Sequence, residues 1–128
     1  MKTKVLIIED NEQNMYMLSF LLEQNNYEVF QAFDGEDGIA AAQSIKPDII
    51  LLDIQLPGMD GYAVARSLRE IEKLKTTPII AVTSHAMVGD KEMAIQVGAN
   101  GYVEKPINPD MFIEEMQKIY TNFSMEEL

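Results

Sequence analysis

The sequence predicts an α/β fold in which one parallel sheet of five strands carries helices on both faces. Short apolar runs recur along the chain, and polar or turn-forming residues bound each of them, which is typical of strands buried on both sides. Segments with helical spacing or helix stop signals lie between these runs, so strand and helix alternate along the chain. This alternation favours a doubly wound sheet with right-handed crossovers.

The first apolar run covers residues 5–8 and ends at the acidic pair Glu9 and Asp10. A helix is predicted next, because Asn11 is a suitable N-cap and leucines follow at positions 18, 21 and 22. The asparagine pair at 25–26 ends this helix, and residues 28–32 form a weaker strand with β-favouring residues at its centre. After a turn at 34–35, a helix of small residues around 39–42 ends before Pro47, since the residue before a proline avoids the helical region.

The strand at residues 49–52 organises the rest of the chain. Four consecutive large apolar residues lead directly into Asp53, and the chain then breaks at Pro57, Gly58 and Gly61. Ligands of open α/β sheets bind outside the carboxyl ends of the strands. Asp53 is therefore placed where ligand binding or catalysis is expected.

The second half of the chain continues the alternation. Residues 62–70 are predicted to be a helix with Val64 and Leu68 facing inward, and residues 79–82 a strand that ends at Thr83. A short helix at 91–97 stops at Gly98, the residue type expected just past a helix end. The fifth strand, at 101–104, ends at Lys105, a helix follows at 110–120, and residues 122–128 are expected to fray. The residues expected to supply the apolar side of the last helix are Met111, Ile113, Met116 and Ile119.

Composition limits the function classes. The 128 residues suit one domain, and 21 acidic against 10 basic residues give a net charge of -11. This excess of negative charge argues against binding to nucleic acid or to an anionic membrane surface. The absence of cysteine excludes disulfides and thiolate chemistry, and the single histidine excludes a histidine-rich metal cluster. The first apolar run is too short for a signal peptide or a membrane span, so we expect a soluble cytoplasmic protein.

Chemistry-bearing side chains stand at four of the predicted strand ends: Glu9, Asp10, Asp53, Thr83 and Lys105. Because these ends share one edge of a parallel sheet, the side chains can converge. Three crowded carboxylates repel one another, and a hard divalent cation with oxygen ligands, such as Mg²⁺, removes that conflict. Lysine and a hydroxyl suit a phosphate group, so the set indicates phosphoryl transfer with Asp53 as nucleophile.

These strand-end motifs resemble the receiver domain of bacterial two-component response regulators. The resemblance rests on Ile-Glu-Asp-Asn at 8–11, the Leu-Asp to Asp-Gly segment at 52–61, Ala-Val-Thr-Ser at 81–84 and Lys-Pro at 105–106. It implies a flavodoxin-like sheet with strand order 2-1-3-4-5. It also implies a domain at residues 1–122, a tail at 123–128 and no effector domain, as in single-domain receivers of the DivK type.

The resemblance implies a role for each residue at this edge. Asp53 would accept the phosphoryl group, Thr83 and Lys105 would contact it, and Tyr102 would change rotamer with the switch. Lys105 and the following proline would be joined by a cis peptide bond. An Mg²⁺ or Mn²⁺ ion would be held by Glu9, Asp10, Asp53 and the backbone carbonyl of Gln55.

The implied partners are proteins. A sensor histidine kinase or a histidine phosphotransfer protein would supply the phosphoryl group, and a downstream protein target would read the state. Nucleic acid and membranes are not expected partners. The residues expected at the partner surface are Met15, Pro106 and Ile107. Met15 is included because Met15 and Tyr16 cannot both share the leucine stripe of the first helix, and an exposed apolar residue beside the site suits a docking kinase.

Three other functions are alternatives to this predicted function. A pseudo-receiver would bind partners without being phosphorylated, yet all the expected site residues are present. A phosphatase of the haloacid dehalogenase type needs a second aspartate two positions after the nucleophile, where this chain has Gln55. Turnover of an outside substrate is therefore not expected. A flavodoxin-like cofactor binder lacks the necessary phosphate loop. Simple packing is the alternative for Tyr102, for which the switch role is favoured, and His85 is expected to be an exposed loop residue.

Overall fold

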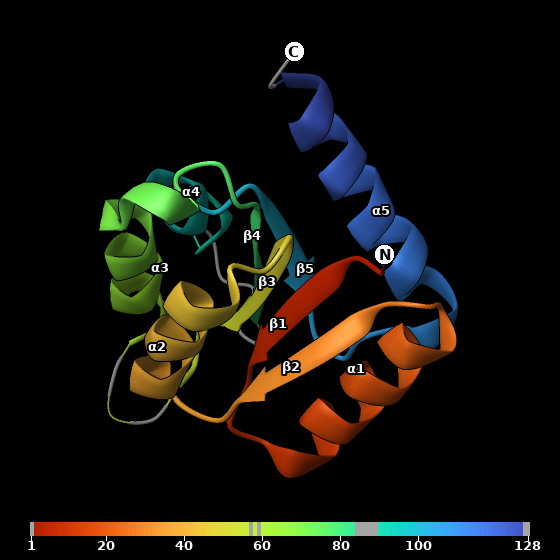
Figure 1. Cartoon of the computed structure of the whole chain (residues 1–128). Helices are drawn as coiled ribbons and strands as arrows, with labels where there is room; N and C mark the ends of the chain where they lie inside the picture. The colour runs from red at the N-terminus through yellow and green to blue at the C-terminus, as the bar shows by residue number, and fades with distance from the viewer. Residues whose placement is uncertain (1, 57, 59, 84–89, 127–128) are drawn as a thin grey trace.

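A computed structural model describes residues 2–56, 58, 60–83 and 90–126 of the chain. Its centre is a five-stranded, all-parallel sheet with strand order β2-β1-β3-β4-β5 (Figure 1), which confirms the predicted fold class and order. The five strands lie within one residue of the predicted bounds. They are β1 (Lys4–Ile8), β2 (Glu28–Ala32), β3 (Ile49–Asp53), β4 (Ile79–Thr83) and β5 (Gly101–Glu104).

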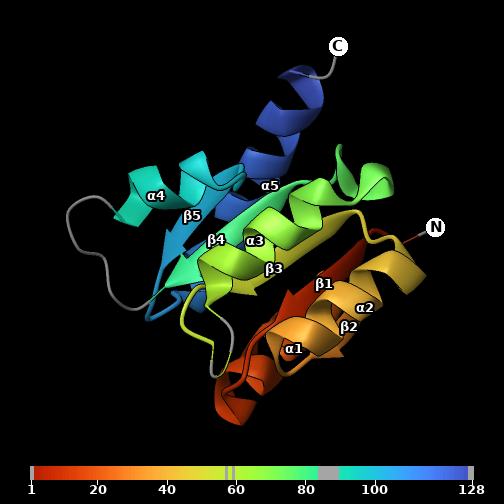
Figure 2. The same cartoon turned by 90° about the vertical axis from the view of Figure 1, so that its left-hand side faces the viewer.

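Helices cover both faces of this sheet. They are α1 (Glu12–Gln24), α2 (Gly35–Ile45), α3 (Gly61–Glu70), α4 (Asp90–Gln96), α5 (Pro109–Glu126) and a short 3₁₀ helix, η1 (Glu72–Leu74). The helices α1 and α5 lie on one face, whereas α2, α3 and α4 lie on the other (Figure 2). Within the described part of the chain, none of the helices has the length and apolar character needed to cross a membrane.

Side-chain caps define where the helices begin. The carboxamide oxygen of Asn11 accepts the N–H of Asn14 at 2.9 Å, as expected for the predicted N-cap of α1. Asp34 caps α2 in the same way, so this helix begins at Gly35 and not after a separate turn as predicted. The helix ends where predicted, with Lys46 in the left-handed region immediately before the proline.

The core has two layers because successive residues of a strand point to opposite faces. In β3, Ile49 and Leu51 pack towards α1 and α5, and Ile50 and Leu52 pack towards α2 and α3. All five residues of β3 are buried. The uninterrupted apolar run in the sequence therefore reflects burial on both faces, as predicted.

The last helix differs from its prediction in phase and length. Met111 is 51% exposed, and its neighbour Phe112 is buried in the core instead. The helix also continues to Glu126, so the expected fraying is wrong for residues 122–126, while 127 and 128 lie outside the described residues. In this last part of the helix, Tyr120 packs against the core. Tyr120 and Phe123 also line a hollow with residues 47–48 and 76–78, at the end of the sheet opposite the strand ends discussed above.

Arg69, near the end of α3, holds several segments together through carbonyl acceptors. Its Nε donates to the Gly98 carbonyl at 2.9 Å, and its Nη1 donates to the carbonyls of Leu74 at 2.9 Å and Thr77 at 2.7 Å. Its Nη2 donates to Oδ1 of Asn100, which also accepts the N–H at the start of β4. One guanidinium thus joins α3, η1, the start of β4 and the turn after α4. The sequence pattern did not predict this link.

Replacing this guanidinium should destabilise the fold. We expect Arg69→Met to lower the free energy of unfolding by about 3 kcal/mol, because hydrogen bonds from a charged donor contribute about 1.5–3 kcal/mol and the buried acceptors lose their partner. Arg66→Met is the matched control, since Arg66 is exposed on the same helix and its loss should change stability by less than about 0.5 kcal/mol. Urea unfolding of both variants measures the difference, and equal midpoints would contradict the role of Arg69.

Candidate functional site: an acidic cluster at the strand ends

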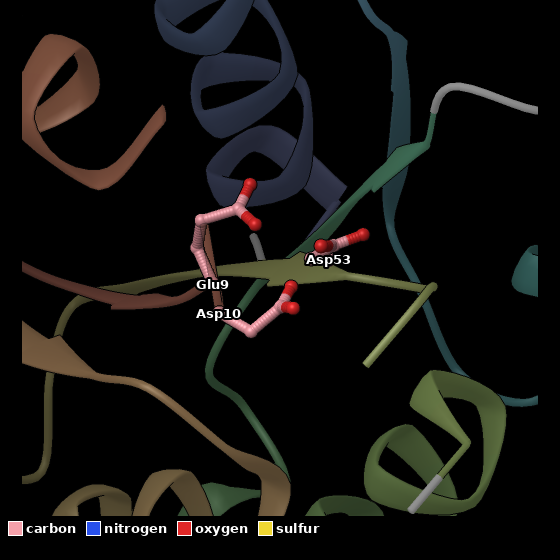
Figure 3. Close-up of side chains that lie close together, drawn as sticks. All are labelled: Glu9, Asp10 and Asp53. Carbon is pink, nitrogen blue, oxygen red and sulfur yellow. The ribbon is translucent and has the colours of Figure 1, made fainter. Parts of the chain in front are cut away.

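The carboxyl ends of β1 and β3 bring three carboxylates together. The register pairs Ile8 with Leu52, so Glu9 and Asp53 are the next residues along two adjacent strands. Glu9 and Asp53 are buried, whereas Asp10 is exposed. One carboxylate oxygen from each of the three residues lies within 4.8 Å of the others (Figure 3). The predicted convergence at this edge is confirmed for the carboxylates.

Lys105 provides the positive charge of the site. Its Nζ lies 2.7 Å from Oε1 of Glu9 and 3.4 Å from Oδ2 of Asp53. Its backbone N–H donates to the Thr83 carbonyl at 2.7 Å, so the ends of β4 and β5 are tied together. The peptide bond between Lys105 and Pro106 is cis, as the resemblance implied.

Backbone donors fix the carboxylates from the other side. The N–H of Gln55 donates to Oδ1 of Asp53 at 2.9 Å, and the N–H of Asn11 donates to Oε2 of Glu9 at 3.2 Å. The loop after Asp53 folds back, because the N–H of Gly61 donates to the Ile54 carbonyl at 3.0 Å. From the sequence pattern alone, Gly61 indicates only a break in the chain. The Asp-Gly pair that caps and begins α3 was the available signal for this closure.

Two further predicted residues border the cluster. Thr83 is buried at the end of β4, directly after the residue that pairs with Asp53 in the sheet. Tyr102 is half-buried in β5 and packs against a small cluster that includes Ile54 and Ala81. Its packing is therefore established, and its role as a switch stays a prediction. His85 lies outside the described residues.

The expected partner surface needs correction at two of its three residues. Met15 is 1% exposed, because it joins Leu18 in the buried stripe of α1, and Tyr16 is the exposed member of the pair. Ile107 is also buried and belongs to the core on the α1 and α5 face. Pro106 alone is exposed.

Crowding alters the acidity of Glu9. Burial is the largest cause that raises the pKa of Glu9, and the neighbouring Asp53 carboxyl raises it further. The ammonium of Lys105 and the N–H of Asn11 act in the opposite direction, and the resulting pKa is about 7. An additional positive charge beside Glu9 would therefore stabilise the ionised form of this carboxyl.

Stability should therefore depend on pH through Glu9. Its pKa of about 7 in the folded protein lies above its ordinary value of 4.5, so the folded state binds more protons between these values. The contribution of Glu9 to stability is full below pH 4.5 and is lost as pH rises towards 7. We expect the melting temperature in chelator, relative to that of Glu9→Gln, to fall over this window. A constant difference between the two proteins from pH 4.5 to 7 would contradict the raised pKa.

The donor set of this cluster fits a hard divalent cation. Carboxylate oxygens are the ligands that Mg²⁺ and Mn²⁺ prefer, and three of them lie within 4.8 Å of one another. Two of the three residues are buried, so a bound cation would offset carboxylate repulsion where water screens it least. These residues can hold a metal ion.

Comparison with known proteins places the chain in a family. Residues 5–117 match the family model described as the response regulator receiver domain. The polar-differentiation response regulator DivK of Brucella anthropi is 40% identical over 117 residues, which cover 91% of this chain and 95% of that protein. DivK of Brucella ovis is 41% identical over the same coverage. The chain belongs to the response regulator receiver domain family.

Solved structures agree with this assignment. The chemotaxis protein CheY4 of Vibrio cholerae has a TM-score of 0.89 and 32% identity, with 93% of this chain and 99% of that chain covered. The receiver domain of a sensor histidine kinase from Pseudomonas aeruginosa has a TM-score of 0.86 and 32% identity, with coverage of 94% and 99%. That structure has a magnesium ion coordinated in its active-site cleft. The protein is thus a receiver domain of two-component signalling that is similar to DivK.

Proposed function

We propose that this receiver is a phosphorylation-dependent switch in which Asp53 accepts a phosphoryl group. A sensor histidine kinase or a histidine phosphotransfer protein is the donor, and the output is a contact with a downstream protein. One observation carries the proposal: Asp53 is buried in a three-carboxylate cluster and lies 3.4 Å from the ammonium of Lys105. The proposed nucleophile, the carboxylates that can hold a cation and the ammonium that can bind a phosphoryl group therefore lie together at the strand ends.

The metal ligands in this proposal are Glu9, Asp10, Asp53 and the backbone carbonyl of Gln55. Mg²⁺, when bound, neutralises negative charge on the carboxylates and on the phosphoryl oxygens. The magnesium ion in the Pseudomonas aeruginosa receiver supports the choice of metal, because that domain is similar to this one over nearly all of its length. Mn²⁺ has the same ligand preference and is expected to substitute.

In the transfer step, a carboxylate oxygen of Asp53 attacks the phosphorus of a phosphohistidine on the donor. A new O–P bond forms, the P–N bond breaks, and its electron pair stays on the imidazole nitrogen, which is then free to take up a proton. Gln55 holds Oδ1 of Asp53 through its N–H, so the carboxylate is oriented before the donor arrives. Lys105 offsets the charge of the phosphoryl group as that group reaches Asp53.

The phosphoryl group changes the local charge balance, and this change drives the switch. Lys105 lies close to Glu9 and Asp53, so a phosphoryl group on Asp53 competes with Glu9 for the same ammonium. The Thr83 hydroxyl supplies a further hydrogen bond, and the two states differ in how Tyr102 packs against its neighbours. Hydrolysis of the acyl phosphate, in which water releases phosphate and regenerates Asp53, resets the switch.

The proposal also includes the domain bounds, the cellular location and the lack of substrate turnover that the sequence predicts. The receiver domain extends over residues 1–122, and residues 123–128 follow it. It acts in the cytoplasm and turns over no outside substrate. The span that matches the family model, 5–117, lies within the proposed domain.

The intact mass of the protein after incubation with a small acyl phosphate donor tests the proposal. We expect a gain of one phosphoryl group in the presence of Mg²⁺ and no gain in excess chelator. Circular dichroism under both conditions confirms that the protein is folded. Absence of any gain from folded protein with Mg²⁺ would reject the switch and favour the alternative, a pseudo-receiver that binds partners without phosphorylation.

A further inference from the structure

A hollow of about 270 Å³ lies at the end of the sheet where β3 and β4 begin. Its apolar walls are Pro47 and Pro78, from the segments that lead into these strands, and Tyr120 and Phe123, from the end of α5. Both aromatic residues are half-buried, and their spacing of three positions puts them on one face of the helix. Pockets for whole small molecules usually measure about 300–1,000 Å³, so this hollow suits a single bulky side chain.

The aromatic wall of the hollow belongs to the part of α5 that lies past the family span. The family model matches residues 5–117, whereas α5 continues to Glu126. Figures 1 and 2 show that the last turns of this helix extend past the ends of the strands. Tyr120 and Phe123 therefore add a feature that the matched receiver span does not contain.

The rim of the hollow carries positive charge, although the net charge of the chain is -11. Lys46 and Lys75 directly precede lining residues, and both are exposed. Lys4 is joined to the lining residue Asp48, because its backbone N–H donates to Oδ2 of Asp48 at 2.8 Å and its carbonyl accepts the N–H of Asp48 at 2.9 Å. Among the described residues, Asp48 is the only acid that lines the hollow or adjoins a lining residue. Three lysines thus stand against one carboxylate.

We propose that this hollow binds an acidic segment of a partner protein through one aromatic side chain of that segment. The aromatic ring would pack against Tyr120 and Phe123, and aspartates or glutamates on either side of it would pair with Lys46 and Lys75. Charge selects this occupant, since a basic segment would meet the three lysines. A second copy placed symmetrically would bring its own lysines against them, and an extended polyanion such as nucleic acid would be repelled by the rest of the chain.

The carboxylate of Asp48 is the feature of the hollow that opposes an anion. One of its oxygens accepts the N–H of Lys4, so the aromatic anchor and not an acidic group would lie against it. Asp48→Asn keeps an oxygen for this N–H and removes the negative charge. We expect this variant to bind the acidic segment about threefold more tightly.

The hollow and the proposed phosphorylation site lie at opposite ends of β3. Asp48 and Asp53 are five residues apart in an extended segment, which corresponds to about 17 Å. A partner held at the hollow would leave the carboxylate cluster open to a phosphoryl donor. Affinity at the hollow should therefore be the same with and without Mg²⁺ and acyl phosphate. The inference goes beyond the proposed switch, and the two proposals can fail independently.

A synthetic peptide with one phenylalanine between two pairs of aspartates, blocked at both ends and labelled with a fluorophore, is the probe for the full chain. Fluorescence anisotropy measures its affinity, and amide chemical-shift changes locate it on the protein. We expect shift changes in segments 46–48 and 75–78 and in the last turns of α5, and binding that weakens as salt is raised. Alanine in place of the phenylalanine should weaken binding at least about tenfold, because aromatic anchors carry most of the energy of such interfaces.

Matched charge variants separate the hollow from general charge attraction. Lys46→Gly combined with Lys75→Gln should weaken binding about fivefold, because each ion pair contributes modestly. Glycine suits this position, since Lys46 caps the end of α2 with a φ of 53°. Arg66→Gln combined with Lys91→Gln removes the same charge from exposed positions elsewhere and should leave affinity unchanged.

Phe123→Ser tests the aromatic wall and should weaken binding at least about tenfold. Phe33→Ser is its control, because Phe33 is 43% exposed and lies after β2, away from the hollow. Urea unfolding checks that both variants are folded. If Phe123→Ser does not fold, the lysine variants and the alanine peptide still decide the question.

Three results would overturn the docking proposal. The first is equal loss of affinity in the two charge variants, and the second is a shift map centred on α1 or on the carboxylate cluster. The third is tighter binding of a peptide in which lysines replace the aspartates. Self-association in sedimentation equilibrium that disappears in Phe123→Ser would likewise reject a partner segment and make a second copy the occupant. Loss of phosphoryl uptake in folded wild type would count against the switch and not against this hollow.

Discussion

Asp53→Asn is expected to abolish phosphoryl uptake while leaving the protein folded. The substitution removes the carboxylate proposed as the nucleophile, which is also one of the three clustered carboxylates. Asparagine keeps an oxygen that can accept the Gln55 N–H, so the loop after β3 should hold its position. Intact mass after incubation with the small acyl phosphate and Mg²⁺ should show no gain. Uptake of one phosphoryl group by the variant would show that another residue is the acceptor.

Asp34→Asn is the control for this variant. It also removes one carboxylate, but Asp34 caps α2 and lies outside the cluster. Asparagine is as good an N-cap as aspartate, so stability should change little. Uptake should equal that of the wild type.

The folded fraction of Asp53→Asn should be at least as high as that of the wild type in chelator, because one of two adjacent buried carboxylates is gone.

Gly61→Ala is expected to be the most destabilising small substitution near the site. A Cβ at this position would lie 2.6 Å from the Ile54 carbonyl oxygen and 2.7 Å from the Asp53 carbonyl oxygen, which are backbone atoms that cannot move aside. We expect a loss of about 3 kcal/mol or more in the free energy of unfolding, as for severe overpacking. Urea denaturation measures this loss. Phosphoryl uptake should slow as well, because the same backbone carries Asp53.

Gly58→Ala provides the comparison within the same loop. Gly58 has a φ of +76°, but among the residues that the structure describes nothing lies within 4 Å of a Cβ added there. Its substitution should cost only the left-handed strain of about 1–2 kcal/mol. If the two alanine variants lose the same stability, contact with the backbone at 53–54 is not what requires glycine at 61.

The strands and the site were predictable because their signals are local. Each strand is an unbroken apolar run, and the residues that carry chemistry come directly after four of these runs. Knowing that the sheet is parallel is then enough to bring Glu9, Asp53 and Lys105 to one edge. No residue in this set depends on the detailed packing of a helix.

Helix phase and long-range links were less predictable. The stripe of α1 includes Met15, and that of α5 includes Phe112, because the direction of each helix over the sheet decides which flank is buried. Apolar spacing alone is compatible with neighbouring choices, such as Met111. The Arg69 link joins segments up to 31 residues apart, through carbonyl oxygens that every residue possesses. Residue types cannot indicate such a contact.

The Arg69 link also holds one end of α4 in place. The guanidinium donates hydrogen bonds to the Gly98 carbonyl and to the Asn100 side chain, just past the end of α4. The segment just past the end of α4 is therefore anchored to α3 by hydrogen bonds. The seven residues of α4 span about 10 Å, so a tilt of about 10° displaces the leading end by about 2 Å. Such a tilt about the anchored end would move the first residue of the helix, Asp90, more than any other residue of α4.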